Sequence, residues 1–459
     1  MFIADEAAIK QTWEPMGASG LRLCFFCRNV VQTRSGLVEA DETGWFVDHC
    51  EEDPSKFKLQ TNAGLWATAR DLTQKSTELS KAAFASRQTS LGMRYSPEGV
   101  LFDPTLREVV FPISWTSYDW MHNYVVSGVF HVEVNLLLKE LKTERVESSH
   151  VHDFVNACCW PSYTGGKSVH AKTLFRKAGD FKCGASEALA CYPVLRGFLE
   201  ELQPGFSSRR MLLAAQCFYR LCETLDLLSH AASGTLRSND LREAILGHLR
   251  SFKTVYGAEH LPPKGHFNVH LPEILDRHGV LLSCFVHERR HKELKRYANQ
   301  QTSMTAGSEK NVMELSVEHH LEVLEDFDAR REGLLKPRPA AQEVARVFCA
   351  AFGRARAPGL EISDTAYFGS GRTCKRGDII VVEMENASHV GQAWFHVSQA
   401  GYLYTCFSPW TRQRDARNRF SHEEGALFVP TSSIKRLCIH RPENDNPNIS
   451  LVIPLRSMF

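Results

Sequence analysis

Four side chains that favour soft metal ions stand in two pairs, far apart in the sequence. Cys24 and Cys27 enclose two phenylalanines in CFFC, and His266 and His270 lie four residues apart in LPPKGHFNVHLPEIL. A C-x2-C loop lets two thiolates bind one tetrahedral ion, and histidines at i and i+4 project from one face of a helix. Zinc in structural sites takes four nitrogen or sulfur ligands, so the two pairs together predict a structural Zn2+ site.

Each pair also has an ordinary explanation when it is considered alone. Many C-x2-C pairs in intracellular chains are incidental thiols, and two histidines at this spacing are often surface or core residues. The 238 residues between Cys27 and His266 are too many for spacing to prove a shared ion. If one ion does bind both pairs, it clamps the beginning of the chain to a segment beyond its middle.

Three acidic residues and one histidine suggest a second kind of chemistry. Asp5 follows the apolar MFIA, and Glu288 comes 18 residues after His270. Asp119 and His122 form DWMH, which contains Trp120 and follows Trp115. Phosphoryl transfer by two metal ions requires carboxylates from different elements to converge on hard cations such as Mg2+. Taken singly, each acid is also typical of a helix cap or a surface charge.

A basic run follows the last of these acids. It consists of Arg289, Arg290, His291, Lys292, Lys295 and Arg296. Such a run suits contact with a phosphate backbone, and it equally suits a solvated helix with Glu–Lys and Glu–Arg pairs.

The order of these segments resembles cut-and-paste DDE transposases of the CACTA/Transib group, which includes the V(D)J recombinase catalytic subunit. ADEAAIKQTWEPMGASGLRLCFFC resembles the block in which an Asp precedes a Gly-containing turn and then C-x2-C. WTSYDWMHNYVVSGVF resembles the D-x-x-H block. LPPKGHFNVHLPEILDRHGVLLSCFVHERRHKELK resembles K-x-H-x-x-x-H followed by the last acid and a basic run. The likeness covers roughly residues 1–300.

The resemblance implies an RNase H-like core interrupted by a helical insertion, and DNA cleavage and joining with Mg2+. In it Asp5 matches the second catalytic acid, Glu288 the third, and Asp119 with His122 the D-x-x-H pair near the catalytic centre. Cys24, Cys27, His266 and His270 match the zinc ligands. The first catalytic Asp has no counterpart, because only four residues precede Asp5. We therefore expect impaired catalysis, as in a truncated gene model, a decayed element or a domesticated relic.

Hydrophobic periodicity divides the chain into four parts. Residues 1–183 are expected to be an α/β part that, by the resemblance, forms a partial RNase H-like core. Residues 184–300 are expected to form an all-α insertion that ends in the H-x3-H segment and the basic helix. Residues 301–364 read as a linker with helices. Residues 365–459 consist of short β-rich runs and predict an SH3-like or BAH-like antiparallel barrel of about five strands. Trp394, Phe395 and Trp410 there are core residues or line a groove for a peptide or histone tail.

Composition limits the partners and the compartment. The chain has 459 residues, 43% of them hydrophobic and 23% charged, and its net charge is +1, so any DNA contact must come from local patches. The 14 cysteines are too sparse for a disulfide scaffold, and neither a signal peptide nor a membrane span is visible. We expect a nuclear protein, with the cytoplasm as the alternative, that binds DNA, forms a homodimer if active, and contacts a peptide or chromatin through its barrel. The alternative function is a non-catalytic, zinc-stabilised DNA-binding, chromatin-binding or protein-interaction module.

Overall fold

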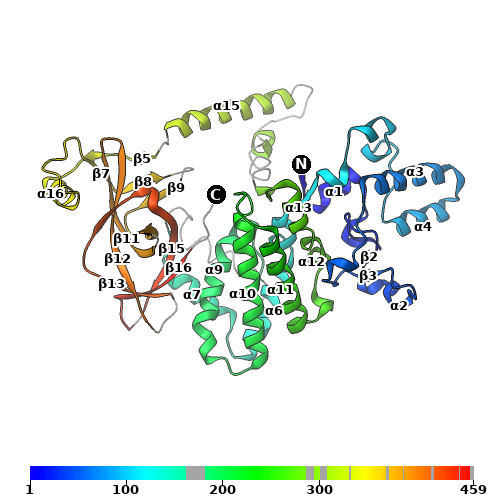
Figure 1. The fold of residues 1–459 in the computed structure, drawn as a ribbon, viewed down its shortest axis with the longest axis horizontal. Helices are drawn as coiled ribbons and strands as arrows, with labels where there is room; N and C mark the ends of the chain where they lie inside the picture. Colours follow the sequence, from blue (N-terminus) through cyan, green and yellow to red (C-terminus); the bar gives the residue numbers. More distant parts are fainter. Residues whose placement is uncertain are drawn as a thin grey trace. The chain divides into compact units, whose positions relative to one another are not determined.

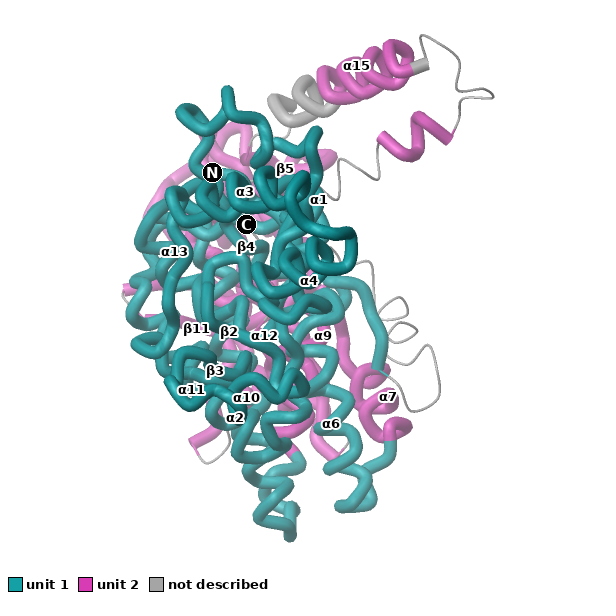
Figure 2. Tube along the Cα trace, turned by 90° about the vertical axis from the view of Figure 1, so that its right-hand side faces the viewer, with its two compact units in different colours: residues 1–147, 180–188, 202–288 teal, residues 148–179, 189–201, 289–459 magenta. Residues whose placement is uncertain are grey.

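The computed structural model describes residues 1–161, 181–285, 294–299, 308–329, 332–368, 372–385, 387–414, 418–443 and 445–454. The chain divides into two compact units. Unit 1 comprises residues 1–147, 180–188 and 202–288, and unit 2 comprises residues 148–179, 189–201 and 289–459 (Figure 2). No helix among the described residues is both long and apolar enough to cross a membrane.

Unit 1 is mainly helical. Its helices are α1 (Glu6–Trp13), α2 (Leu37–Ala40), α3 (Asn62–Glu78), α4 (Lys81–Leu91), α5 (Pro112–Trp115), α6 (Val129–Thr143), α10 (Arg209–His230), α11 (Ser238–Tyr256), α12 (Pro263–Asn268) and α13 (Leu271–His278) (Figure 1). The long helices α10 and α11, which the sequence periodicity predicts, pack together, and α10 also packs against α6. Their shared core contains Leu137, Phe218 and Phe252, each no more than 2% exposed.

A buried polar cluster crosses this helical core. Glu133 Oε2 on α6 lies 2.6 Å from His248 Nε2 on α11, and both side chains are fully buried. Cys217 on α10 completes the cluster. A hydrogen-bonded pair at this depth fixes how α6 and α11 are aligned, because either partner alone would be an uncompensated buried polar group.

The β-structure of unit 1 is small. Over the described residues it consists of two separate parallel sheets of two strands each, β1 (Phe2–Ala4) with β4 (Thr116–Tyr118) and β2 (Val30–Val31) with β3 (Val47–Asp48). The RNase H-like core implied by the resemblance therefore remains a prediction.

Unit 2 contains a closed antiparallel barrel. Six strands pair in a ring: β10 (Ile379–Met384), β11 (Ala387–Gln399), β12 (Tyr402–Arg412), β13 (Arg419–His422), β16 (Ile449–Pro454) and β15 (Ile434–Pro442), which returns to β10. The predicted barrel is thus present, with six strands where the sequence indicated about five. Its strands contribute to two buried clusters. One contains Ile380, Ala393 and Phe407, none of them exposed to solvent, and the other draws on all six strands of the ring through Ile379, Val390, Trp410, Phe420, Cys438 and Val452.

Further strands and helices surround the barrel within unit 2. These are the strands β5 (Gly333–Leu334), β6 (Arg338–Pro339), β7 (Glu361–Ser363), β8 (Thr365–Phe368), β9 (Arg372–Lys375) and β14 (Leu427–Pro430), and the helices α7 (Ser148–Ala157), α15 (Ser308–Ala329) and α16 (Gln342–Ala351). Most of α9 (Ala185–Leu202) also belongs here, and its Glu201 forms an ion pair with Arg441 of β15. Phe348 of α16 is fully buried in a cluster with Leu360, Ile362 and Val397.

Candidate metal centre and acidic edge

The two cysteines lie on a tight loop near the start of unit 1. Cys24 and Cys27 are separated by Phe25 and Phe26, and all four side chains are buried. Backbone bonds from Arg28 N–H to the Lys58 carbonyl (2.8 Å) and from Gln60 N–H to the Phe26 carbonyl (2.9 Å) hold the loop against the segment before α3. The loop therefore presents both sulfur atoms in a fixed direction.

The two histidines lie where α12 meets α13. His266 is on α12, and His270 is the residue that begins α13 with helical backbone angles. The chain stays helical across this junction, so the spacing of four places both imidazoles on one side, as the sequence predicted. His266 is 1% exposed and His270 2%.

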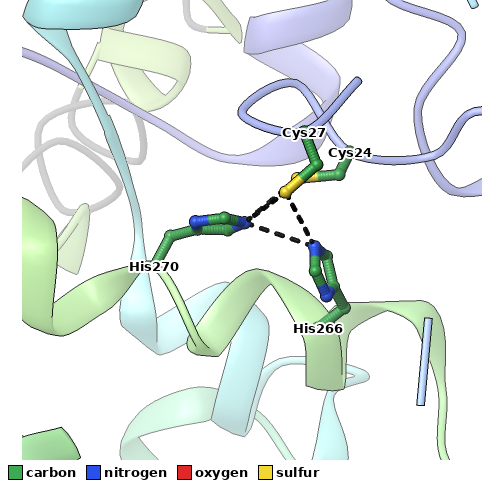
Figure 3. A group of neighbouring side chains, drawn as sticks. All are labelled: Cys24, Cys27, His266 and His270. Atoms are coloured by element: carbon green, nitrogen blue, oxygen red, sulfur yellow. Dashed lines mark hydrogen bonds between the residues drawn. The ribbon is translucent and has the colours of Figure 1, made fainter. Parts of the chain in front are cut away.

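The four side chains point at one another (Figure 3). Cys24 Sγ lies 3.3 Å from His270 Nε2, Cys27 Sγ lies 3.2 Å from His270 Nε2 and 3.5 Å from His266 Nε2, and the two Nε2 atoms are 3.2 Å apart. Zinc–sulfur and zinc–nitrogen bond lengths give ligand separations of about 3.3 to 3.8 Å around a tetrahedron. The spacing fits one such ion, so the cluster could hold a metal such as zinc.

The protonation pattern of the cluster suits metal binding. Burial by itself raises the pKa of the Cys24 thiol, but the Cys27 hydrogen bond and the imidazoles of His270 and His266 bring it well below its usual range. Burial and the Cys24 thiolate raise the pKa of Cys27 well above its usual range. The pair thus shares one proton that a cation would displace, because zinc binds the thiolate form of cysteine.

An aromatic shell encloses the cluster. The ring of Phe57 meets that of His266 edge-on with centroids 4.9 Å apart, and Tyr118 stacks on Phe267 at 4.8 Å. The Tyr118 hydroxyl accepts a hydrogen bond from Phe25 N–H at 3.2 Å and lies 3.8 Å from Cys24 Sγ. Tyr118 thereby ties the cysteine loop to β4.

The strand pair β1–β4 brings two of the predicted acids together. Ala4 pairs with Tyr118 in parallel register, so the next residues, Asp5 and Asp119, lie side by side at the carboxyl ends of both strands. Asp119 N–H also donates to the Ala4 carbonyl at 3.1 Å. Asp5 and Asp119, 114 positions apart in the sequence, therefore share one edge of the sheet, which we call the acidic edge.

His122 lies between the two acids. It is part of a π-helical turn, Met121–Val125, a local geometry that is often found at functional sites. Its Nδ1 is hydrogen-bonded to Asp119 Oδ2, and its Nε2 lies 4.0 Å from Asp5 Oδ2. Gly128 follows this turn, and a Cβ there would lie only 2.1 Å from the Asn123 carbonyl oxygen, so only glycine fits.

The carboxylates of Asp119 and Asp5 differ in the hydrogen bonds that they accept from the protein. Asp119 is buried, and its Oδ1 accepts hydrogen bonds from Met121 N–H and Cys284 N–H, each at 3.2 Å. Asp5 caps α1 through Oδ1, which accepts from Ala8 N–H at 2.7 Å, and its side chain is about one-third exposed. Asp119 is therefore placed to orient His122, while Asp5 offers an oxygen toward solvent.

A shallow hollow of about 250 Å³ opens beside this edge. Asp5, Glu6, Ala7, Lys10, His122 and Lys264 line it. Lys264 Nζ donates to the carbonyls of His122 (3.1 Å) and Val126 (3.0 Å), which ties α12 to the π-helical turn. Burial lowers the pKa of Lys264.

Several of the other predicted residues lie outside the described part of the chain. Glu288, Arg289, Arg290, His291 and Lys292 are outside the described part of the chain. Lys295 and Arg296 are exposed on the helical segment 294–299. Trp120 is 3% exposed and therefore belongs to the core, whereas Trp115 is 40% exposed.

The three aromatic residues singled out in the barrel differ in how far they are buried. Trp410 is 7% exposed and stacks on His422 with ring centroids 4.0 Å apart, so it is a core residue. Phe395 packs against the cluster around Phe348, whereas Trp394 is 40% exposed.

The sequence interpretation gave neither Lys264 nor Tyr118 a role in the site. Lys264 is the lysine of the K-x-H-x-x-x-H block, two residues before His266, so its position was a usable signal. Tyr118 immediately precedes Asp119, but only the strand register shows that its hydroxyl reaches the cysteine loop.

Comparison of the chain with protein-family models, curated proteins and solved structures finds no match.

Proposed function

We propose that this chain is a transposase-derived, nuclear DNA-binding protein. In this proposal unit 1 carries a structural zinc site and an acidic edge for metal-dependent phosphodiester cleavage. The observation that carries it is the parallel register of β1 and β4, which aligns Asp5 with Asp119 and places His122 between them. The buried Cys2His2 cluster supports the same proposal, because it lies on the segments that adjoin this edge.

In this proposal the residues of the acidic edge have different roles in phosphodiester cleavage. Asp5, with Glu288 as its partner from the resemblance, would hold Mg2+, which supplies charge stabilisation of the attacking and leaving oxygens when bound. Asp119 holds His122 in one orientation, so Nε2 is directed toward Asp5 and can accept a proton from an attacking water. Lys264 and Lys10 place positive charge around the hollow that a phosphate would enter.

A nicking assay tests the proposal. Supercoiled plasmid is incubated with Mg2+ and the zinc-loaded protein, and nicked product is quantified. We expect Asp5→Asn to lower nicking by about 100-fold or more, since asparagine also caps helices and the fold is kept. Glu288→Gln should have the same effect, and Glu39→Gln, at an exposed acid outside the edge, should have none. Equal nicking by Asp5→Asn and the unmodified protein would defeat the assignment.

A second function has its own support. Both carboxylate oxygens of Asp119 already form hydrogen bonds with protein groups. This favours a module that retains the arrangement of Asp5, Asp119 and His122 but does not cleave DNA. Such a non-catalytic, zinc-stabilised DNA-binding or chromatin-binding protein would bind DNA with a steep salt dependence and leave the plasmid intact. Trp394 would then be the first barrel residue to test for peptide binding.

A further inference from the structure

Three arginines from separate segments of unit 1 meet around one hollow beside the metal centre. Arg22 precedes Cys24 by two residues, Arg28 directly follows Cys27, and Arg87 lies on α4. All three line a hollow of about 310 Å³, within the size range of ligand pockets. The start of α3 forms another part of its wall through Gly64, Leu65 and Thr68.

The local backbone fixes the position of Arg22. Arg22 pairs with Val31 as an isolated antiparallel bridge. Gly92 ends α4 with φ +68°, and a Cβ there would lie 2.7 Å from the Arg22 Cβ. Gly92 also accepts a hydrogen bond from Met16 N–H at 2.9 Å. The glycine therefore lets the end of α4 pack directly on Arg22.

The charge around this hollow is unbalanced. Its one acidic lining residue, Asp71, already receives two hydrogen bonds from Arg87, at 2.9 and 3.0 Å. Among the described residues no carboxylate comes within ion-pair distance of Arg22 or Arg28. Zinc bound by two thiolates and two neutral imidazoles carries no net charge, so the metal centre would not neutralise these cations.

Aromatic rings lie next to two of the arginines. The guanidinium of Arg28 lies 6.0 Å from the Trp45 ring centroid, and that of Arg22 lies 5.9 Å from the Phe46 ring centroid. Trp45 is 38% exposed. Unpaired guanidinium groups beside an exposed indole suit a nucleic-acid strand, because arginine binds phosphate and every base offers a face for stacking.

We propose that the hollow formed by Arg22, Arg28 and Arg87 binds a backbone phosphate of DNA, and that Trp45 stacks on an unpaired base next to it. The inference takes from the proposed function only that the ligand is DNA. It does not depend on cleavage at the acidic edge.

The test measures DNA binding by the zinc-loaded full chain without added Mg2+. Fluorescence anisotropy with labelled single-stranded and duplex DNA gives the affinity over a salt series. Arg28→Gln and the double variant Arg22→Gln/Arg28→Gln are compared with Arg209→Gln, which removes an exposed arginine that does not line the hollow. Metal analysis of each variant confirms that the zinc is retained.

We expect the slope of log affinity against log salt to fall by about one for each arginine removed from the hollow, and to stay unchanged in Arg209→Gln. Trp45→Ala should weaken single-stranded DNA binding by about tenfold and duplex binding by less. An unchanged slope in Arg28→Gln and in the double variant, with zinc retained, overturns the proposal. Calorimetric titration with inorganic phosphate accompanies these measurements, and variants that lose affinity for phosphate but bind DNA normally overturn the assignment to nucleic acid. Absence of nicking, by contrast, would defeat the proposed function and leave these slopes unaffected.

Discussion

At the residue scale, the four candidate metal ligands were predictable because their types and spacing are specific. C-x2-C and H-x3-H each define a local geometry that can be read from the sequence. Only the structure shows that the two pairs lie close together in space. Tyr118 and the arginines around the hollow were not predictable in the same way. A tyrosine hydroxyl at 3.8 Å from Cys24, or three guanidinium groups around one hollow, depends on contacts between segments that carry no local pattern.

Tyr118→Phe tests the hydroxyl that supports the cysteine loop. The variant keeps the stacking on Phe267 but leaves the buried Phe25 N–H without its acceptor. We expect the free energy of unfolding to fall by about 1–3 kcal/mol, measured by denaturant titration of the zinc-loaded protein. Tyr402→Phe, at a residue 69% exposed on the barrel, is the control and should change stability by less than about 0.5 kcal/mol. Equal stability of Tyr118→Phe and the unmodified protein would show that this hydrogen bond contributes nothing.

At the element scale, the sequence predicted the helical bundle and the barrel better than it predicted the β-structure of unit 1. Long amphipathic helices such as α10 and α11 repeat their apolar pattern over several turns, so their existence is clear from sequence. β1 and β4 have only three residues each, and their parallel pairing across 114 positions has no local signal. The edge that aligns Asp5 with Asp119 therefore required the structure. In the barrel, the sixth strand was missed because β13 has only four residues.

The barrel carries a pH dependence that can be measured. Burial, only partly opposed by the Cys374 carbonyl and Asp364, lowers the pKa of His396 to about 4. Burial and His422 likewise lower the pKa of His440 to about 4. An unfolded histidine has a pKa of about 6.5, so between these values the unfolded chain binds protons that the folded barrel does not.

The stability that these histidines contribute is therefore complete above about pH 6.5 and is lost as the pH falls toward 4. Each contributes up to about 1.4 kcal/mol per pH unit in this window. His396→Gln should make the dependence of unfolding free energy on pH shallower, as measured by denaturant titration between pH 4.5 and 7. A slope as steep as that of the unmodified protein would contradict the burial argument.

At the scale of the whole molecule, unit 2 shows which segments the barrel needs. The sequence interpretation placed a boundary at residue 365, but β6, β7 and α16 precede it and cover the barrel. Phe348, Leu360 and Ile362 bury apolar surface against Val397. These residues lie in a stretch that reads as a linker, because their partners are on strands far along the chain.

Two fragments test this arrangement. We expect residues 332–459 to be more stable than residues 365–459 by on the order of 5 kcal/mol, because the longer fragment keeps the three buried side chains of the cover. Denaturant titrations of both fragments measure the difference. Phe348→Ala in the longer fragment should remove about 3–5 kcal/mol of it. Equal stability of the two fragments would show that the barrel folds without this cover.

The claim on which the account of unit 1 depends is that Cys24, Cys27, His266 and His270 bind one ion. Zinc analysis combined with X-ray absorption at the zinc edge tests it most directly. The account predicts one zinc per chain with two sulfur neighbours at about 2.3 Å and two nitrogen neighbours at about 2.0 Å. It also predicts loss of that zinc in Cys24→Ser and in His270→Ala, with retention in Cys349→Ser. A chain that folds without metal, or that binds zinc equally well in Cys24→Ser and His270→Ala, would contradict the account.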